Sequence, residues 1–326
     1  RSDCALEVPL DGGRLFLPFL GRAQLTIADP PETATLRSWP EGGEILATGA
    51  RVRIPVNPRV DGDGWWGIRR LTVGAAGLST SFLLDDLDPY RFPGGRTSGR
   101  LDTVGFGQWQ RALGEAWPLL VAHHPETAEE IAGGVAVLVP LDALRGYRMS
   151  ATSQHSFGTV GLSRPSHGCL FAADLAHERQ HAKLNALLDL VSLIDDPDQT
   201  RWYAPWRDDP RPLGALLHGA YAHLGVAAFW RLQRHLDRGE AALRAHTEFA
   251  RWRDETRKVV SVLRASGALT RCGIRFIDGM AATLDAWREE SVPAAAVQQA
   301  RTAAIKHRAA WLLRHGQSGE GQPPRE

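Results

Sequence analysis

Two histidines stand four residues apart between Asp174 and Leu190, with a glutamate directly after the first. They are His177 and His181, the glutamate is Glu178, and neither proline nor glycine interrupts this run. Side chains at i and i+4 project from one face of a helix, so both imidazoles can reach a single ion. In the HExxH pattern the glutamate serves as a base or supports a ligand. The run therefore predicts a helix that carries a metal site.

The same helix shows an apolar stripe that indicates burial. The stripe consists of Leu175, Leu184, Leu187, Leu188, Val191 and Ile194. Buried polar groups are costly unless they have partners, and a divalent cation is a suitable partner for two neutral imidazoles. A chance histidine pair on a solvated helix face is the competing interpretation. We expect the helix to end near Asp195-Asp196-Pro197, because proline disfavours helical geometry in the residue before it.

Composition excludes several functional classes. Lys and Arg number 38 against 37 Asp and Glu, so net charge gives no reason to expect nucleic-acid binding. The longest apolar run, residues 131–141, is too short to span a bilayer, so we expect no membrane insertion. Cys4, Cys169 and Cys272 lack CxxC spacing, which favours a reducing compartment and a cytoplasmic protein. No secretory core or initiator methionine is present, so we expect a processed chain or a C-terminal part of a fusion.

The first 95 residues have a pattern typical of short strands. Candidate strands are Arg14–Leu20, Gln24–Ile27, Ala34–Trp39, Arg51–Val56, Ile68–Val73 and Ser79–Leu84. Turn residues such as Pro40-Glu41-Gly42-Gly43 separate them, which favours antiparallel pairing. We expect residues 1–95 to form a β-rich N-terminal portion.

Residues 96–315 are predicted to be mainly helical and to carry the metal site. Buried strands are expected at 133–141 and 157–162, and helices at 213–236, 239–265, 277–288 and 292–314. A helix from Thr103 should bury Phe106, Trp109, Leu113, Trp117 and Leu120. Residues 316–326 form a polar tail that we expect to be disordered. The predicted fold class is α+β, and one compact domain is the alternative to two portions.

A metal held by two histidines needs at least one further protein ligand. Leu184 and Leu187 occupy the positions of the glycine and histidine in one HExxH variant, and no glutamate occurs between the motif and Glu240. His218 lies in the next helical segment, where small residues allow close helix packing. We therefore predict His218 as the third ligand and His223 as the second choice. A hydrogen-bonded core histidine is the alternative for either residue.

Two arginines stand between the metal helix and this next helix. Arg207 and Arg211 are placed among prolines and tryptophans in the segment Trp202–Pro212. Rigid guanidinium groups near a metal suit bidentate capture of a carboxylate. The alternative is that both arginines pair with Asp208, Asp209 or helix ends.

Several segments together resemble one family. They are residues 157–163, 175–181, 183–189, 205–207 and 217–219. These segments are similar to the HExxH-motif peptide-modification proteins, which include α-ketoglutarate-dependent HExxH peptide β-hydroxylases. Such enzymes occur alone or fused behind radical-SAM cyclophane-forming enzymes. The resemblance runs from residue 153 to residue 230 and is weak in the N-terminal third.

The resemblance implies Fe(II), α-ketoglutarate and O2 acting on a ribosomally synthesised precursor peptide, with hydroxylation at a Cβ position. It implies a fold unlike the cupin or jelly-roll barrel of other such oxygenases. A fused or separate radical-SAM enzyme is then an expected partner. Three histidines would hold iron: His177, His181 and His218. Arg211 or Arg207 would hold the distal carboxylate of α-ketoglutarate.

Glu178 has a different role in each enzymatic interpretation. In the oxygenase it would accept a hydrogen bond from a metal ligand. In a zinc-dependent peptidase it would be the general base. A third interpretation is a non-catalytic peptide-binding domain with a tryptophan-rich surface. That surface would use Trp65, Trp66, Trp202 and Trp206. Ser153, His155 and Ser163 are further polar candidates for the cleft.

Overall fold

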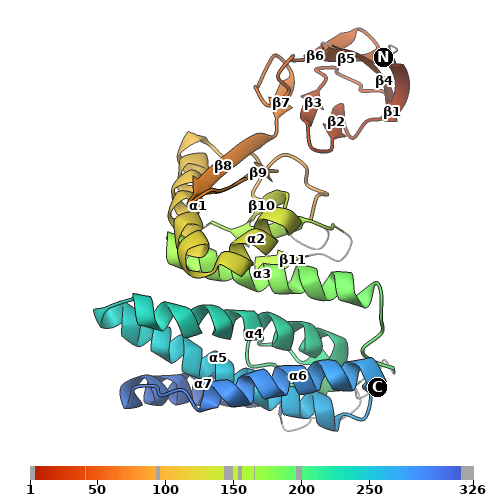
Figure 1. Cartoon of the computed structure of the whole chain (residues 1–326). Coiled ribbons are helices and arrows are strands. Elements are labelled where there is room, and N and C mark those ends of the chain that lie inside the picture. The colour runs from red at the N-terminus through yellow and green to blue at the C-terminus, as the bar shows by residue number, and fades with distance from the viewer. Residues whose placement is uncertain are drawn as a thin grey trace. The chain divides into compact units, whose positions relative to one another are not determined.

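The computed structural model describes residues 4–40, 42–92, 96–142, 150–152, 156–164, 166–195 and 200–316. These residues form an α+β fold, β-rich in the N-terminal half and helical in the C-terminal half (Figure 1). The chain divides into two compact units, residues 1–122 with 128–171 and residues 123–127 with 172–326. Residues on both sides of position 95 thus belong to the first unit. Residues 93–95, and 317–326 of the predicted tail, lie outside the described residues.

Two small antiparallel sheets begin the first unit. The four-stranded sheet has the order β1 (Cys4–Pro9), β4 (Thr33–Trp39), β5 (Gly42–Ala47) and β6 (Ala50–Ile54). The three-stranded sheet has the order β2 (Arg14–Leu17), β3 (Gly21–Gln24) and β7 (Trp65–Gly67). Ile45 and Trp65 are fully buried in their shared core. The predicted strand 14–20 is in fact interrupted at Phe19, whose φ of 64° belongs to a turn.

A five-stranded mixed sheet completes the first unit. Its order is β11 (Ser150–Thr152), β12 (Thr159–Ser163), β10 (Val137–Leu141), β9 (Leu78–Leu84) and β8 (Arg69–Ala75). β10 runs parallel to both β9 and β12, and every residue of β10 and β12 is buried. Strands covered on both faces are apolar throughout, as the sequence of β10 shows.

Helices α1 (Thr103–His123) and α2 (Pro125–Gly134) separate β9 from β10. The predicted face of α1 is confirmed for Trp109, Leu113, Trp117 and Leu120, which are all buried. The predicted strand from residue 133 was wrong at its start, because α2 continues to Gly134. The strand predicted from residue 157 also begins later, because Gly158 adopts a φ of 72° before β12.

The second unit is helical. It includes α3 (Gly168–Leu188) from Ala172 onward. The short strand pair β13 (Arg201–Trp202) and β14 (Arg211–Pro212) follows. Four helices follow: α4 (Leu213–Leu236), α5 (Gly239–Ala265), α6 (Arg271–Arg288) and α7 (Ala294–His315). All four were predicted, and α6 begins early because the Thr270 hydroxyl caps it by accepting from the Gly273 amide. None of the described helices has the length and hydrophobicity of a membrane span.

Helix α3 ends at Leu188, earlier than predicted. Leu193 is buried, and its carbonyl accepts a hydrogen bond of 3.1 Å from the Thr270 amide. The Asp195 amide donates to the Ala268 carbonyl at 2.9 Å. These bonds replace the helical ones, so contact with the residues before α6 decides where α3 stops.

Two glycines of α6 give a matched test of this contact. A methyl group at Gly273 would lie 2.0 Å from the Leu193 carbonyl oxygen, whereas one at Gly279 would meet nothing within 4 Å. Gly273→Ala should therefore lower the free energy of unfolding by roughly 1–3 kcal/mol. Gly279→Ala should raise it by about 0.5–1 kcal/mol, because alanine is the better helix former. Denaturant unfolding of the full chain measures both, and equal effects would contradict the close approach.

Candidate metal centre

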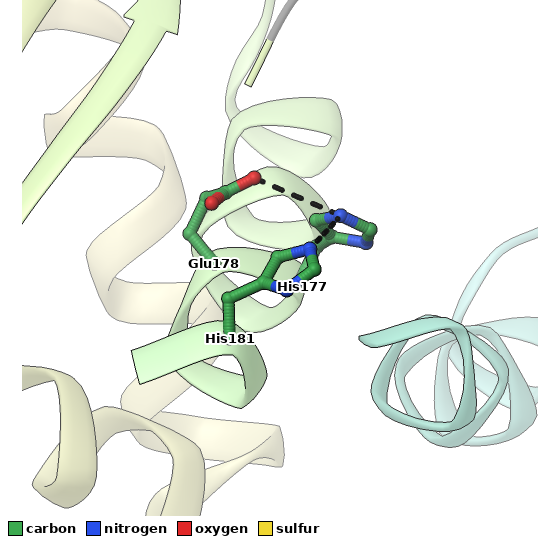
Figure 2. A group of neighbouring side chains, drawn as sticks. All are labelled: His177, Glu178 and His181. Atoms are coloured by element: carbon green, nitrogen blue, oxygen red, sulfur yellow. Dashed lines mark hydrogen bonds and ion pairs between the residues drawn. The ribbon is translucent and has the colours of Figure 1, made fainter. Parts of the chain in front are cut away.

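Three side chains of α3 gather at one point. Figure 2 shows the rings of His177 and His181 meeting through their nitrogens, with the Glu178 carboxylate beside them. The two Nε2 atoms are 3.1 Å apart, and Glu178 Oε1 lies 3.7 Å from His177 Nε2. One possible ligand atom from each residue falls within 4.8 Å of the others. The predicted pairing of the two imidazoles on one helix face is thus present.

Burial keeps both imidazoles neutral. Desolvation, followed by the charge of His223, lowers the pKa of His177 well below its ordinary value. Desolvation, followed by the charges of His177 and His218, does the same for His181. A neutral imidazole offers a nitrogen lone pair to a metal. At metal–nitrogen distances of about 2.0–2.1 Å, two ligands at a right angle are about 2.9 Å apart and tetrahedral ligands about 3.3 Å. The 3.1 Å spacing lies between these values.

His218, the predicted third ligand, lies next to the pair. Its ring centroid is 6.0 Å from that of His181, with an angle of 23° between the rings. Burial lowers the pKa of His218, so it is also a neutral donor. Its nitrogens fall outside the group of ligand atoms formed by the α3 residues. The ligand role of His218 stays a prediction.

His223, the second choice, comes closer to the pair than expected. Its ring centroid is 5.0 Å from that of His177. Its Nδ1 lies 2.8 Å from the Gly219 carbonyl oxygen, which can only accept, so Nδ1 carries the proton and Nε2 bears a lone pair. Metal-binding histidines commonly use this arrangement. Desolvation outweighs the hydrogen bond to Gly219, and His181 and Arg251 add to it, so the pKa of His223 falls to about 3.

Two indoles enclose His223. Trp206 stacks on it at a centroid distance of 4.4 Å, and Trp252 of α5 lies at 4.5 Å. A methyl group at Gly219 would come within 2.3 Å of the Trp206 ring, so glycine is needed where this indole crosses α4. Sequence reasoning missed Trp252, because no spacing in the chain connects α5 with α3; only helix packing brings them together.

Both predicted arginines bind one carboxylate. Arg207 Nε donates to Asp209 Oδ1 at 2.9 Å, and Arg211 Nη1 donates to Oδ2 at 2.8 Å. Burial alone would raise the pKa of Asp209, but hydrogen bonds from Arg211 and Arg207 and their charges hold it below its ordinary value. The pairing foreseen as an alternative is therefore present. Each guanidinium has five N–H donors, so further donors remain on both.

Helix α7 anchors the segment that carries these arginines. The Tyr203 hydroxyl lies 2.8 Å from His307 Nδ1, and Arg314 Nη1 is 2.9 Å from Asp208 Oδ2. Trp311 packs edge-on against the Tyr203 ring. The segment is thus fixed by α7 at Tyr203 and Asp208, and between them Trp206 packs against Gly219 of α4.

The remaining candidates have different outcomes. Trp65 is fully buried in the first unit, and Trp202 packs against the helical core of the second, so neither offers the exposed surface of a binding domain. Ser163 is buried at the end of β12. Ser153 and His155 lie outside the described residues.

Comparison with known proteins leaves the site to be interpreted from its own geometry. No model of a known protein family matches the chain, and no curated protein matches it.

Proposed function

We propose that this chain is an Fe(II)- and α-ketoglutarate-dependent dioxygenase that hydroxylates a Cβ position in a ribosomally synthesised precursor peptide. The observation that carries the proposal is the pair of neutral, half-buried imidazoles with Nε2 atoms 3.1 Å apart. Imidazole and carboxylate donors suit Fe(II), so the residues present fit this ion. The sequence resemblance supports the choice of cosubstrate and of a peptide substrate.

His177 and His181 would hold the iron together with a third residue, His218 of α4. Iron with α-ketoglutarate and O2 supplies the oxidation, in which one oxygen atom enters a C–H bond and the keto acid becomes succinate and CO2. Neutral histidine ligands leave the charge of the ion uncompensated, which suits a dianionic cosubstrate in a buried site. Glu178 is fully buried, with Oε1 3.7 Å from the ligand nitrogen of His177, and would accept a hydrogen bond from a metal-bound water.

Arg211 would bind the distal carboxylate of α-ketoglutarate, with Arg207 as the alternative. Arg211 immediately precedes α4, and its side chain is 33% exposed against 55% for Arg207. The less exposed guanidinium binds a carboxylate more strongly, because water screens it less. A cytoplasmic location, a radical-SAM partner and a fold distinct from the cupin oxygenases belong to the same proposal. The imidazole pair lies on helix α3 and not on the strands of a barrel, which supports a fold distinct from the cupin oxygenases.

A zinc-dependent peptidase is the second candidate. It is favoured by one observation, the buried Glu178 carboxylate 3.7 Å from His177 Nε2. A carboxylate so placed can serve as the general base on zinc-activated water. This function requires neither O2 nor α-ketoglutarate. Under it, Glu178→Gln abolishes peptide cleavage while zinc is retained.

Stepwise anaerobic loading tests the proposed function. Fe(II) followed by α-ketoglutarate should produce a charge-transfer absorption band that needs both additions, because the keto acid chelates the iron. His177→Ala should remove the band. A wild-type protein that retains zinc, shows no band and cleaves peptides without O2 would establish the peptidase instead.

The third ligand can be identified by iron content. His218→Ala should lower Fe(II) occupancy roughly tenfold or more, since loss of a ligand costs at least as much as loss of a supporting contact. His223→Phe keeps the aromatic packing and should leave occupancy unchanged. His235→Ala, an exposed histidine of α4, is the matched control. Iron lost in His223→Phe but kept in His218→Ala would reverse the assignment.

The two arginines are separated by titrating the charge-transfer band. Arg211→Ala should raise the α-ketoglutarate concentration needed for half-maximal absorbance about 10- to 100-fold, as expected for a lost charged hydrogen bond. Iron binding should stay intact. Arg207→Ala should have a smaller effect, and the reverse order of effects would assign the carboxylate to Arg207.

A further inference from the structure

A groove of about 580 Å³ runs between α5 and α7, and its lining is strongly basic. Five cationic side chains face two carboxylates there. The cations are Arg251, Arg257, Lys258, Arg288 and Arg301, and the carboxylates are Asp254 and Glu255. The chain as a whole is almost neutral, so this excess of positive charge is local to the groove.

Both carboxylates of the groove are already neutralised. Asp254 pairs with Arg253 at 2.8 Å, and Glu255 pairs with Lys258 at 2.5 Å. Arg257 is held by Asp285 outside the groove, through two hydrogen bonds of 2.7 and 3.0 Å. The surplus therefore comes from the other three arginines.

Those arginines are Arg251, Arg288 and Arg301, and none forms an ion pair with any residue that the structure describes. The floor between the cations is apolar, with Ala250 and Ala300 buried and Ile305 64% exposed. The three unpaired arginines come from three helices, Arg251 from α5, Arg288 from α6 and Arg301 from α7. A segment with several carboxylates and an apolar side chain can contact these arginines and the floor together.

The groove is connected to the candidate metal centre by direct contacts. The Arg251 guanidinium lies over the Trp252 ring at 4.4 Å. Trp252 packs on His223 at 4.5 Å, and His223 lies 5.0 Å from His177. A chain bound in the groove thus has one end beside Trp252, which packs on His223.

We propose that the α5–α7 groove binds an acidic segment of the peptide on which the chain acts. The groove supplies charge complementarity along its rim and an apolar contact on its floor. This inference rests on the proposed function for the peptide's identity, but the binding itself requires neither iron nor α-ketoglutarate.

Fluorescence anisotropy of the metal-free full chain tests the groove, with fluorescein-labelled deca-glutamate as the probe. Wild type should bind it, binding should weaken as salt increases, and His177→Ala should bind equally well. Arg288→Glu with Arg301→Glu should weaken binding roughly tenfold or more, because like charges then face each other. Lys306→Glu makes the same charge change as Arg301→Glu alone, on α7 but outside the groove, and should bind as wild type does.

Failure of wild type to bind deca-glutamate would overturn the inference. A loss of binding in Lys306→Glu as large as that in Arg301→Glu would overturn it as well. Stronger binding of a ten-residue oligothymidylate would instead indicate a nucleic-acid site. Arg288 and Arg301 are both exposed, so the double variant should keep its circular dichroism spectrum, and Arg301→Glu alone should show a smaller loss in the same direction. None of these binding measurements uses metal. A failed iron experiment would therefore not affect the evidence for peptide binding in the groove, and a failed binding experiment would not affect the evidence for iron.

Discussion

Two neutral imidazoles held 3.1 Å apart on one face of α3 are the constraint on which the second unit depends. A charged histidine pair would be costly there, because desolvation penalises the protonated forms of His177 and His181. Their lone pairs therefore need a cation or a hydrogen-bond donor rather than a counter-ion. Two more imidazoles from α4, both with lowered pKa values, and a buried carboxylate from α3 itself add further lone pairs, and a divalent cation is a suitable partner for such a group.

Bringing α4 this close to α3 requires small residues at particular positions. A methyl group at Gly225 would lie 2.5 Å from Gln180 Cγ of α3, and one at Gly219 would meet Trp206. Gly214, in the first turn of the same helix, has nothing within 4 Å. Among these three glycines, close packing is thus found at Gly219 and Gly225, in the part of α4 that carries His223 and passes the candidate metal centre.

The sequence predicted what depends on local periodicity and missed what depends on packing. The spacing of His177 and His181 determines their meeting, because i and i+4 share a helix face in any environment. The four C-terminal helices followed from the same period. Neither the end of α3 at Leu188 nor the sandwich of His223 between Trp206 and Trp252 could be foreseen, since residues distant in sequence decide both. The end of α2 was missed because Gly133 and Gly134 were assigned to the strand that follows.

The shared contact of Arg207 and Arg211 with Asp209 bears on the proposed binding of α-ketoglutarate in two ways. It shows that this pair of guanidinium groups already accommodates a carboxylate, with hydrogen bonds of 2.9 and 2.8 Å. It also sets the free energy needed to replace Asp209 by another carboxylate. Asp209 is 48% exposed, and ion pairs in contact with water contribute about 0–1 kcal/mol. Under the proposed function, the distal carboxylate of α-ketoglutarate would belong to a ligand already held at the metal, so its high effective concentration would favour it over Asp209. Asp209 would then hold the arginines in position before that ligand binds.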